Sequence, residues 1–333
     1  MRRFLLLTLF IPVFAFTGIA AASGTTVNLV AFSTPKPVME KLITRWTGMP
    51  AGQNVSFTQS YGPSGSQAKA IIAGQPADVF LASNALDVNS LVNAGLVQNH
   101  WSTTLPQGGM VANSVVTFVV RPGNPKGIHQ WSDLIKPGVQ VVTPDPFPSG
   151  GAKWNVLAAY GAERKMGKTN AQAIKYMYSL FHHVVQQDTS ASAAMNTFLA
   201  GKGDVLLTYE SEAYTALLAG KPVKLIQPKQ TILIQLPMVP LKSAPTAASA
   251  FIKYARSYSA QKVFTNNGYR PVIKSVLNED SLAKWKARFN IQGHVIVKIS
   301  DALFGGWSKA WAVWFSPNGR MVKIEQAVGG PTS

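Results

Sequence analysis

Short apolar runs alternate along the chain with segments whose apolar residues recur at helical spacing. Val27–Phe32 and Val55–Gln59 are typical of buried strands, and the helical segments Val38–Trp46 and Ala68–Gly74 follow them. The same alternation predicts further strands at Ala77–Ala82, Val115–Arg121, Val139–Val142, Val184–Gln187, Asp204–Thr208 and Thr231–Pro240, and further helices at Asp87–Ala94, Ala152–Tyr160, Ala193–Ala200 and Ala247–Ser257. Strands separated by helices indicate an α/β fold with parallel strands joined by helical crossovers.

Four of the predicted helices begin directly after a short segment rich in serine, glycine and proline. Prolines at positions 144, 146 and 148 exclude a helix before Ser149, which is the expected N-cap. Gly150 and Gly151 come next and would allow a ligand to approach the bare backbone. The other three helix starts are at residues 33–35, 62–67 and 190–192. All four follow predicted strands, where ligands of open α/β sheets bind, and helix N-termini attract anions.

Several short motifs occur in order between about residue 28 and residue 310. They are G-P-S-G-S-Q-A (Gly62–Ala68), R-P-G-N-P-K (Arg121–Lys126), W-S-D-L-I-K-P-G-V (Trp131–Val139), P-S-G-G-A-K-W-N (Pro148–Asn155), N-T-F (Asn196–Phe198), G-D-V-L-L-T-Y-E-S-E-A (Gly203–Ala213), Y-R-P (Tyr269–Pro271) and F-G-G-W-S-K-A (Phe304–Ala310). Taken together, these motifs resemble those of the periplasmic sulfate-binding proteins of ABC importers, a family that includes thiosulfate-binding proteins.

The resemblance implies a two-lobed periplasmic binding protein fold of type II. In this fold each lobe is a mostly parallel sheet flanked by helices, and the ligand lies in the cleft. The expected boundaries are residues 1–22 for a signal peptide, 23–114 with 236–280 for lobe I, 115–235 for lobe II, and 281–333 for a C-terminal segment that packs across the lobes. The strands Val115–Arg121 and Thr231–Pro240 would connect the lobes, with hinges within them.

The resemblance also implies a set of sulfate ligands. The backbone N–H donors would be those of Ser33, Ser64, Gly150, Gly151 and Ala191, and the side-chain hydroxyl would be that of Ser149. Tyr209 stands where the family has a tryptophan indole, Ser33 stands where relatives often have aspartate, and Ser192 replaces a common arginine. No carboxylate lies at any of the four helix starts, which favours a fully ionised oxyanion over one that still carries a proton. Thiosulfate, molybdate and tungstate remain alternatives to sulfate.

The N-terminus has the features of an export signal. Two arginines precede the apolar run Phe4–Phe16, and three alanines at positions 20–22 form a small-residue cleavage site. The chain has no cysteine, which excludes disulfides and a lipoprotein anchor. We therefore expect a free mature protein in the periplasm, with the signal peptide removed.

The charge of the chain raises a competing interpretation. Its 31 Lys and Arg residues outnumber its 14 Asp and Glu residues, which gives a formal net charge of +17. A protein this basic could be an extracytoplasmic protein that binds acidic polymers. The basic residues are scattered, however, with no run of four and no interleaved aromatic residues, so nucleic acid is not an expected partner.

Catalytic motifs are incomplete in this sequence. Gly161 and Gly167, before Lys168 and Thr169, are separated by five residues where a phosphate-binding loop requires four. Neither Ser64 nor Ser149 lies in a G-x-S-x-G frame, and no H-E-x-x-H metal motif occurs. We therefore expect no enzymatic activity, no cofactor and no metal. The expected partners are sulfate and the permease subunits of an ABC transporter, and the protein is expected to be a monomer.

Overall fold

The computed structural model describes residues 24–273, 275–276 and 291–331. The expected signal peptide therefore lies outside the described residues. Residues 277–290, at the expected boundary between lobe I and the C-terminal segment, also lie outside them. The strands are β1 (Thr25–Phe32), β2 (Val55–Gly62), β3 (Val79–Leu81), β4 (Met110–Val120), β5 (Val141–Pro144), β6 (Val184–Asp188), β7 (Val205–Tyr209), β8 (Lys224–Ile226), β9 (Gln230–Pro240) and β10 (Val295–Val297). The helices are α1 (Lys36–Thr47), α2 (Ser64–Ile72), α3 (Ala85–Asn93), α4 (Trp101–Thr104), α5 (Gly150–Lys165), α6 (Asn170–His182), α7 (Ala191–Leu199), α8 (Glu210–Leu218), α9 (Thr246–Ala255), α10 (Tyr258–Asn266), α12 (Gly306–Trp314) and α13 (Arg320–Val328).

The predicted α/β alternation is confirmed, although α1, α2, α3, α5, α7 and α9 each begin one to four residues before the predicted start. Helix α2 begins at Ser64, four residues before the predicted start at Ala68. The N–H of Gln67 donates to the carbonyl of Pro63 at 2.9 Å, and this bond closes the first helical turn. Ser64 therefore lies inside the first turn, where N–H groups have no partner within the helix and small residues are tolerated.

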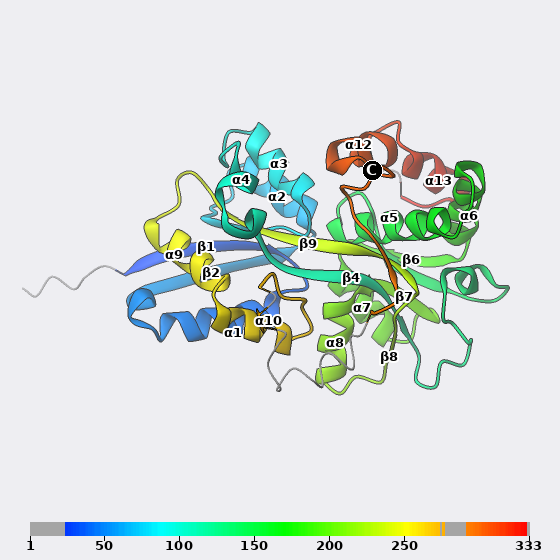
Figure 1. Cartoon of the computed structure of the whole chain (residues 1–333), viewed down its shortest axis with the longest axis horizontal. Helices are drawn as coiled ribbons and strands as arrows, with labels where there is room; N and C mark the ends of the chain where they lie inside the picture. Colours follow the sequence, from blue (N-terminus) through cyan, green and yellow to red (C-terminus); the bar gives the residue numbers. More distant parts are fainter. Residues whose placement is uncertain (1–23, 274, 277–290, 332–333) are drawn as a thin grey trace, which may run out of the picture.

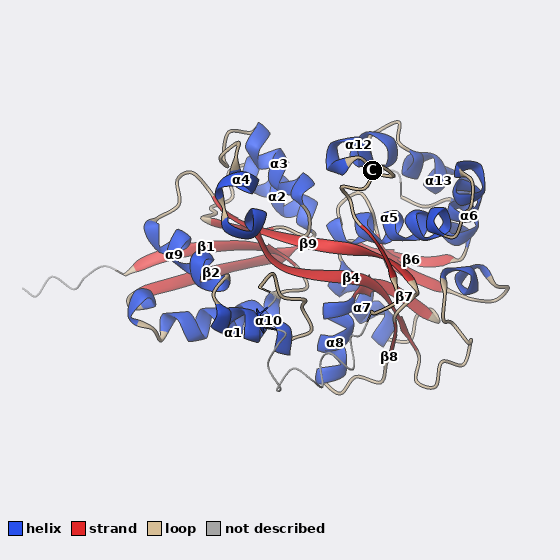
Figure 2. Ribbon diagram, viewed as in Figure 1, coloured by secondary structure: helices blue, strands red, loops and turns tan. Residues whose placement is uncertain are grey.

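The strands form one continuous sheet in the order β2-β1-β3-β9-β4-β7-β5-β6, and β8 and β10 pair with β4 and β9. Strands β1, β2 and β3 are parallel to one another, and so are β5, β6 and β7. The pairs β3–β9, β9–β4 and β4–β7 are all antiparallel. Three reversals make the two parallel sets run in opposite directions, so their carboxyl ends face the same central region (Figure 2).

The long strands β4 and β9 connect the two parallel sets. Figure 1 shows helices grouped around each set, with β4 and β9 running across the space between the groups. Residues Val115–Val120 of β4 are all buried, which explains the uninterrupted apolar run in the sequence. The division into two lobes that move relative to one another stays a prediction.

Aromatic contacts fix the helices on the sheet. Near α1, the Trp46 ring meets Phe57 and Phe251 edge-on, with ring centroids 5.8 and 5.4 Å away. On the opposite side, Trp307 of α12 packs against Trp154 of α5 with centroids 4.6 Å apart. Helix α12 also contacts α3, so this C-terminal helix touches elements of both groups.

No helix in the described ranges is both long enough and apolar enough to cross a bilayer.

Candidate functional site

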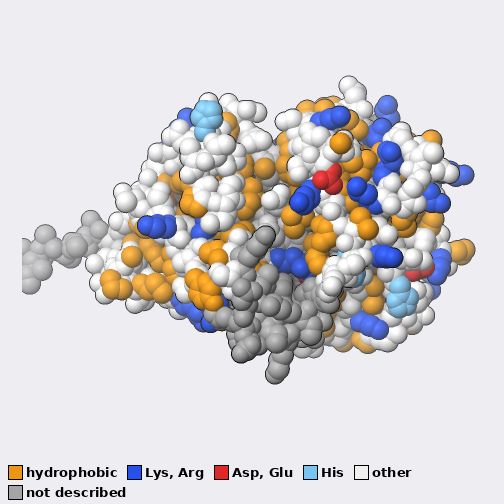
Figure 3. All heavy atoms as spheres, in the orientation of Figure 1, with side chains coloured by type: hydrophobic (Ala, Val, Ile, Leu, Met, Phe, Trp, Pro, Cys, Tyr) orange, Lys and Arg blue, Asp and Glu red, His pale blue; other side chains and the backbone are white. Residues whose placement is uncertain are grey.

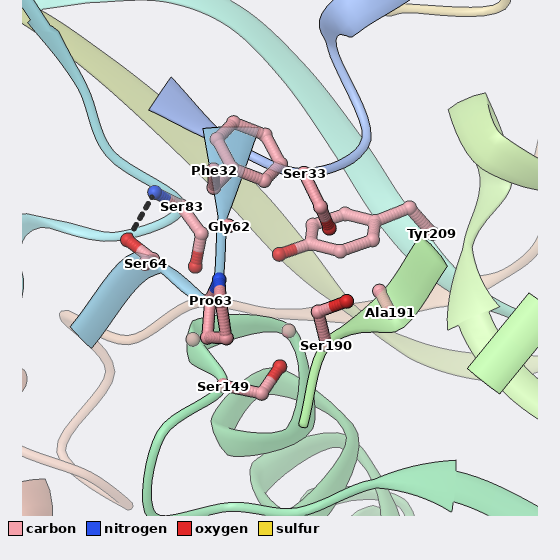
Figure 4. A pocket seen from close by; sticks show the side chains of 12 residues that line it. Phe32, Ser33, Gly62, Pro63, Ser64, Ser83, Ser149, Ser190, Ala191 and Tyr209 are labelled. Atoms are coloured by element: carbon pink, nitrogen blue, oxygen red, sulfur yellow. Dashed lines mark hydrogen bonds between the residues drawn. The ribbon is translucent and has the colours of Figure 1, made fainter. Parts of the chain in front are cut away.

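The four predicted helix starts meet at one cavity. It has a volume of about 10 Å³ and is lined by Phe32, Ser33, Gly62, Pro63, Ser64, Ser83, Ser149, Gly150, Gly151, Ser190, Ala191 and Tyr209 (Figure 4). All seven residues predicted for the site are in this lining. Pockets for drug-sized ligands usually span about 300–1,000 Å³, so this cavity is suited to a much smaller molecule.

The sheet explains why these residues meet. Ser33 and Pro63 directly follow β1 and β2, Tyr209 is the last residue of β7, and Ser83 and Ser190 lie two residues beyond β3 and β6. All of these strands belong to the two parallel sets whose carboxyl ends face the centre. The cavity therefore lies at the position that open α/β sheets use for ligands.

Hydrogen bonds within the protein determine which backbone donors remain for a ligand at α5. Ser149 is the N-cap, as predicted, because its Oγ accepts from the N–H of Ala152 at 3.3 Å. The first turn closes with the bond from the N–H of Lys153 to the carbonyl of Ser149. Gly150 and Gly151 precede Ala152 and Lys153 in the chain, so helix geometry leaves their N–H groups without an intrahelical partner.

Helices α7 and α2 follow the same rule. Ser190 Oγ accepts from the N–H of Ala193, and the N–H of Ser192 donates to Ser33 Oγ at 3.5 Å. Neither bond uses the N–H of Ala191, which is thus the first backbone donor that this end of α7 presents to the cavity. At α2, the N–H of Gly65 donates to the carbonyl of Pro148 at 3.1 Å, while that of Ser64 precedes the first helical bond.

The side chain of Tyr209 adds a donor from the opposite wall. Tyr209 is 2% exposed, and its hydroxyl is buried without a hydrogen-bond partner. Figure 4 shows this hydroxyl directed into the cavity. Burial raises the pKa of Tyr209 well above 10; the Ser83 side chain partly offsets the rise without completing a hydrogen bond. Tyr209 therefore stays protonated and can donate one O–H.

The structure gives the two glycines of α5 a packing role beside the predicted one. A Cβ on Gly150 would come within 1.9 Å of Ser83 Oγ, and a Cβ on Gly151 would come within 2.8 Å of the Tyr209 ring. The space beside each glycine is thus filled by protein side chains. The glycines therefore leave room for Ser83 and Tyr209, and the close approach of a ligand to their bare backbone stays a prediction.

Ser83 is a lining residue that the sequence reasoning missed. The pattern S-N-A-L-D at residues 83–87 does predict a helix start, and Asn84 Oδ1 accepts from the N–H of Asp87 at 3.1 Å. That signal identifies Asn84 as the cap of α3. It does not reveal that Ser83 meets the N-terminus of α5.

Charged side chains surround the cavity without lining it. Lys153 is buried, and its Nζ donates to the carbonyl of Phe147 at 3.0 Å. Burial lowers the pKa of Lys153, while Asp87 and Asp145 oppose that change. On the other side, Glu210 forms a bidentate ion pair with Arg270, with both N–O distances at 2.7 Å. The lining itself contains no Lys, Arg, Asp or Glu, so its donors are neutral.

The described residues do not form a metal site or a phosphate loop at the positions considered in the sequence. No group of three or more His, Asp and Glu within the described ranges is arranged to hold a metal ion. Gly167 has a φ of +85° after the end of α5, and Thr169 caps α6 in a capping box with Gln172. Residues 161–169 are therefore a helix end and a turn, as expected.

Glu212 predicts how stability depends on pH. Burial raises its pKa from 4.5 to about 7, against the opposing effect of hydrogen bonds from Thr208 and Ser192. The folded protein therefore binds more protons here than the unfolded chain between these two pH values. Stability is fully present below pH 4.5 and is lost as the pH rises through about 7. We expect Glu212→Gln to flatten this decline by up to about 3 kcal/mol, measured by urea unfolding at pH 5 and pH 8.

The exposed Glu40 provides the control for this experiment. Glu40→Gln should retain the wild-type slope, which also includes a contribution from Glu325, whose pKa is likewise raised to about 7. Equal slopes in wild type and Glu212→Gln would show that Glu212 ionises normally in the folded state.

Comparisons with known proteins agree with this geometry. Residues 27–270 match the family described as "Bacterial extracellular solute-binding protein". The sulfate-binding protein of Synechococcus elongatus is 35% identical over 91% of this chain and 87% of its own length. That of Salmonella typhimurium is 37% identical over 83% of this chain and 84% of its own.

A solved structure is similar over nearly its whole length. The sulfate-binding protein SubI from Mycobacterium tuberculosis superposes with a TM-score of 0.80 at 37% identity, covering 86% of this chain and 97% of that one. The mixed α/β fold expected from the sequence is therefore the fold of this group. The chain belongs to the family of bacterial extracellular solute-binding proteins, whose members bind solutes and are not enzymes, and its relatives there include the sulfate-binding proteins.

Proposed function

We propose that this protein captures sulfate outside the inner membrane and delivers it to the permease of an ABC importer. The observation that supports this most directly is the convergence of four helix N-termini on one small cavity with neutral donors. The donors would be the backbone N–H groups of Ser33, Ser64, Gly150, Gly151 and Ala191, with the hydroxyls of Ser149 and Tyr209. Relatives at 35–37% identity are sulfate-binding proteins, which supports the same ligand.

Neutral donors are sufficient to bind a dianion in a dry site. Each hydrogen bond to a charged group contributes about 1.5–3 kcal/mol, and each helix N-terminus adds roughly 0.3–2 kcal/mol. Desolvation and the loss of motional freedom offset much of the sum. Micromolar affinity, which corresponds to about 8 kcal/mol, is therefore within reach of seven such contacts.

The donor set favours sulfate over phosphate. Hydrogen phosphate keeps a proton at neutral pH and is bound best where a carboxylate accepts that proton. The lining contains no carboxylate, while serine and tyrosine hydroxyls and backbone N–H groups supply donors. Sulfate has no proton to donate, so every one of its oxygens can accept from this wall.

The cellular setting of the proposal follows from the sequence and the family. The N-terminal signal would direct export, and the mature protein would work in the periplasm as a monomer after removal of residues 1–22. On the face drawn in Figure 3, Lys and Arg side chains are spread over the surface. Such a distribution provides little support for binding an acidic polymer along one band.

Calorimetric titration of the mature protein with sulfate, thiosulfate, molybdate and phosphate tests the proposal. We expect saturable one-to-one binding of sulfate with a weak dependence on sodium chloride, because the site is buried. Phosphate should bind much more weakly. If thiosulfate or molybdate binds more tightly than sulfate, that anion and not sulfate is the ligand. Binding only to polyanions, with a steep loss as salt rises, would overturn the oxyanion proposal.

Two substitutions at the start of α5 separate binding from capping. Ser149→Ala should weaken sulfate binding about 10- to 150-fold, the effect of losing one hydrogen bond to a charged partner. Gly151→Asp should abolish binding, because it adds a like charge and would collide with Tyr209. The measurements are calorimetry and the melting temperature of the ligand-free variants. If Ser149→Ala loses about 1 kcal/mol of stability but binds sulfate like the wild type, the Ser149 side chain is only a helix cap.

We also propose that the predicted lobes, residues 23–114 with 236–280 and residues 115–235, close around sulfate. The hinges would lie at Val115–Val120 in β4 and Thr231–Pro240 in β9, the strands that connect the two groups of helices. Small-angle X-ray scattering should show a smaller radius of gyration when sulfate saturates the protein. An unchanged scattering profile at saturation would mean that the ligand enters without closure.

A further inference from the structure

Ser83, just before α3, joins two of the helices whose starts form the cavity, α2 and α5. It lies between β3 and α3 and is fully buried. Its N–H donates to Ser64 Oγ of α2 at 3.0 Å, and its carbonyl accepts from Trp154 Nε1 of α5 at 2.8 Å. These two backbone bonds fix the residue between α2 and α5, two helices that lie in different groups of the fold.

The hydroxyl of Ser83 has a proton available for a ligand. Ser83 Oγ accepts from Asn84 Nδ2 at 3.2 Å, so its own O–H is directed elsewhere. It faces the Tyr209 hydroxyl, whose pKa it lowers without completing a hydrogen bond. Figure 4 shows the Ser83 and Tyr209 hydroxyls on facing sides of the same small space. One acceptor between them would satisfy both donors.

Ser83 lies directly beside Gly150 in the wall of the cavity. A Cβ on Gly150 would lie 1.9 Å from Ser83 Oγ and 2.9 Å from Ser83 Cβ. Only glycine at position 150 therefore allows Ser83 to reach its observed place. The N–H of Gly150 is itself one of the donors left free by the helix, so the two groups address the same point.

We infer that Ser83 is a further oxyanion-binding residue, whose hydroxyl donates to the bound anion beside the N–H of Gly150. The inference rests on the proposed function and adds one side-chain donor to it. It also assigns the strict need for glycine at position 150 to Ser83. The ligand class is unchanged: a small oxyanion with no proton to donate.

Calorimetry with sulfate on Ser83→Ala tests the donor. This substitution keeps both backbone bonds and removes only the hydroxyl, so sulfate should bind about 10- to 150-fold more weakly. Ser66→Ala, an exposed serine of α2 outside the lining, is the matched control and should bind like wild type. The melting temperature of the sulfate-free variants should stay near that of wild type.

The reciprocal test uses Gly150. Gly150→Ala should lose most sulfate binding because its Cβ would meet Ser83 Oγ. Adding Ser83→Gly in the same chain removes Ser83 Oγ and Cβ but leaves Asn84 Nδ2 at 2.6 Å from that Cβ, so it should restore part of the binding shown by Ser83→Gly alone. Such non-additivity is the signature of two groups in direct contact, and a merely structural role for Ser83 would not produce it.

The outcomes distinguish this inference from the proposed function. If the wild type does not bind sulfate or a related oxyanion, the proposed function itself fails. If the wild type binds and Ser83→Ala stays within threefold of it, Ser83 is not a donor. If the double variant binds no better than Gly150→Ala, the coupling between Ser83 and Gly150 is wrong.

Discussion

The need to satisfy buried N–H groups at helix N-termini determines the architecture of this site. Each helix begins with N–H groups that its own backbone cannot use, and burying them without an acceptor is costly. The protein satisfies some internally: Ser149 caps Ala152, Ser190 caps Ala193, and Pro148 accepts from Gly65. The donors that remain are those aimed at the cavity. The caps thus separate the backbone donors used within the protein from those proposed to bind the ligand.

The sheet makes that convergence possible. Three consecutive antiparallel pairings, from β3 through β9 and β4 to β7, turn the second parallel set against the first. Without this reversal, the carboxyl ends of the two sets would point the same way and could not face each other. The strands β4 and β9 therefore both position the donors and supply the connection at which closure is proposed.

Much of this arrangement could be predicted from the sequence, because proline, glycine and serine mark helix starts through local backbone chemistry. Ser149 and Ala191 were identifiable on that basis, and the family motif pointed to Tyr209. Ser83 was not, because its role depends on a neighbour 67 positions away in sequence, Gly150. The same gap hid the packing role of the glycines, since a sequence shows that a side chain is missing but not what occupies its space.

Because the lining carries no charge, the strength of anion binding would depend on how well water is excluded from the cavity. Hydrogen-bond donors attract an anion strongly only where water is excluded, because a high dielectric weakens every such contact. The contacts that close the cavity, from Trp154 to Ser83 and from Gly65 to Pro148, therefore do more than hold elements together. They determine the dielectric in which the neutral donors act. In the proposed site, affinity would therefore depend on closure, and the net positive charge of the chain would draw anions toward the protein.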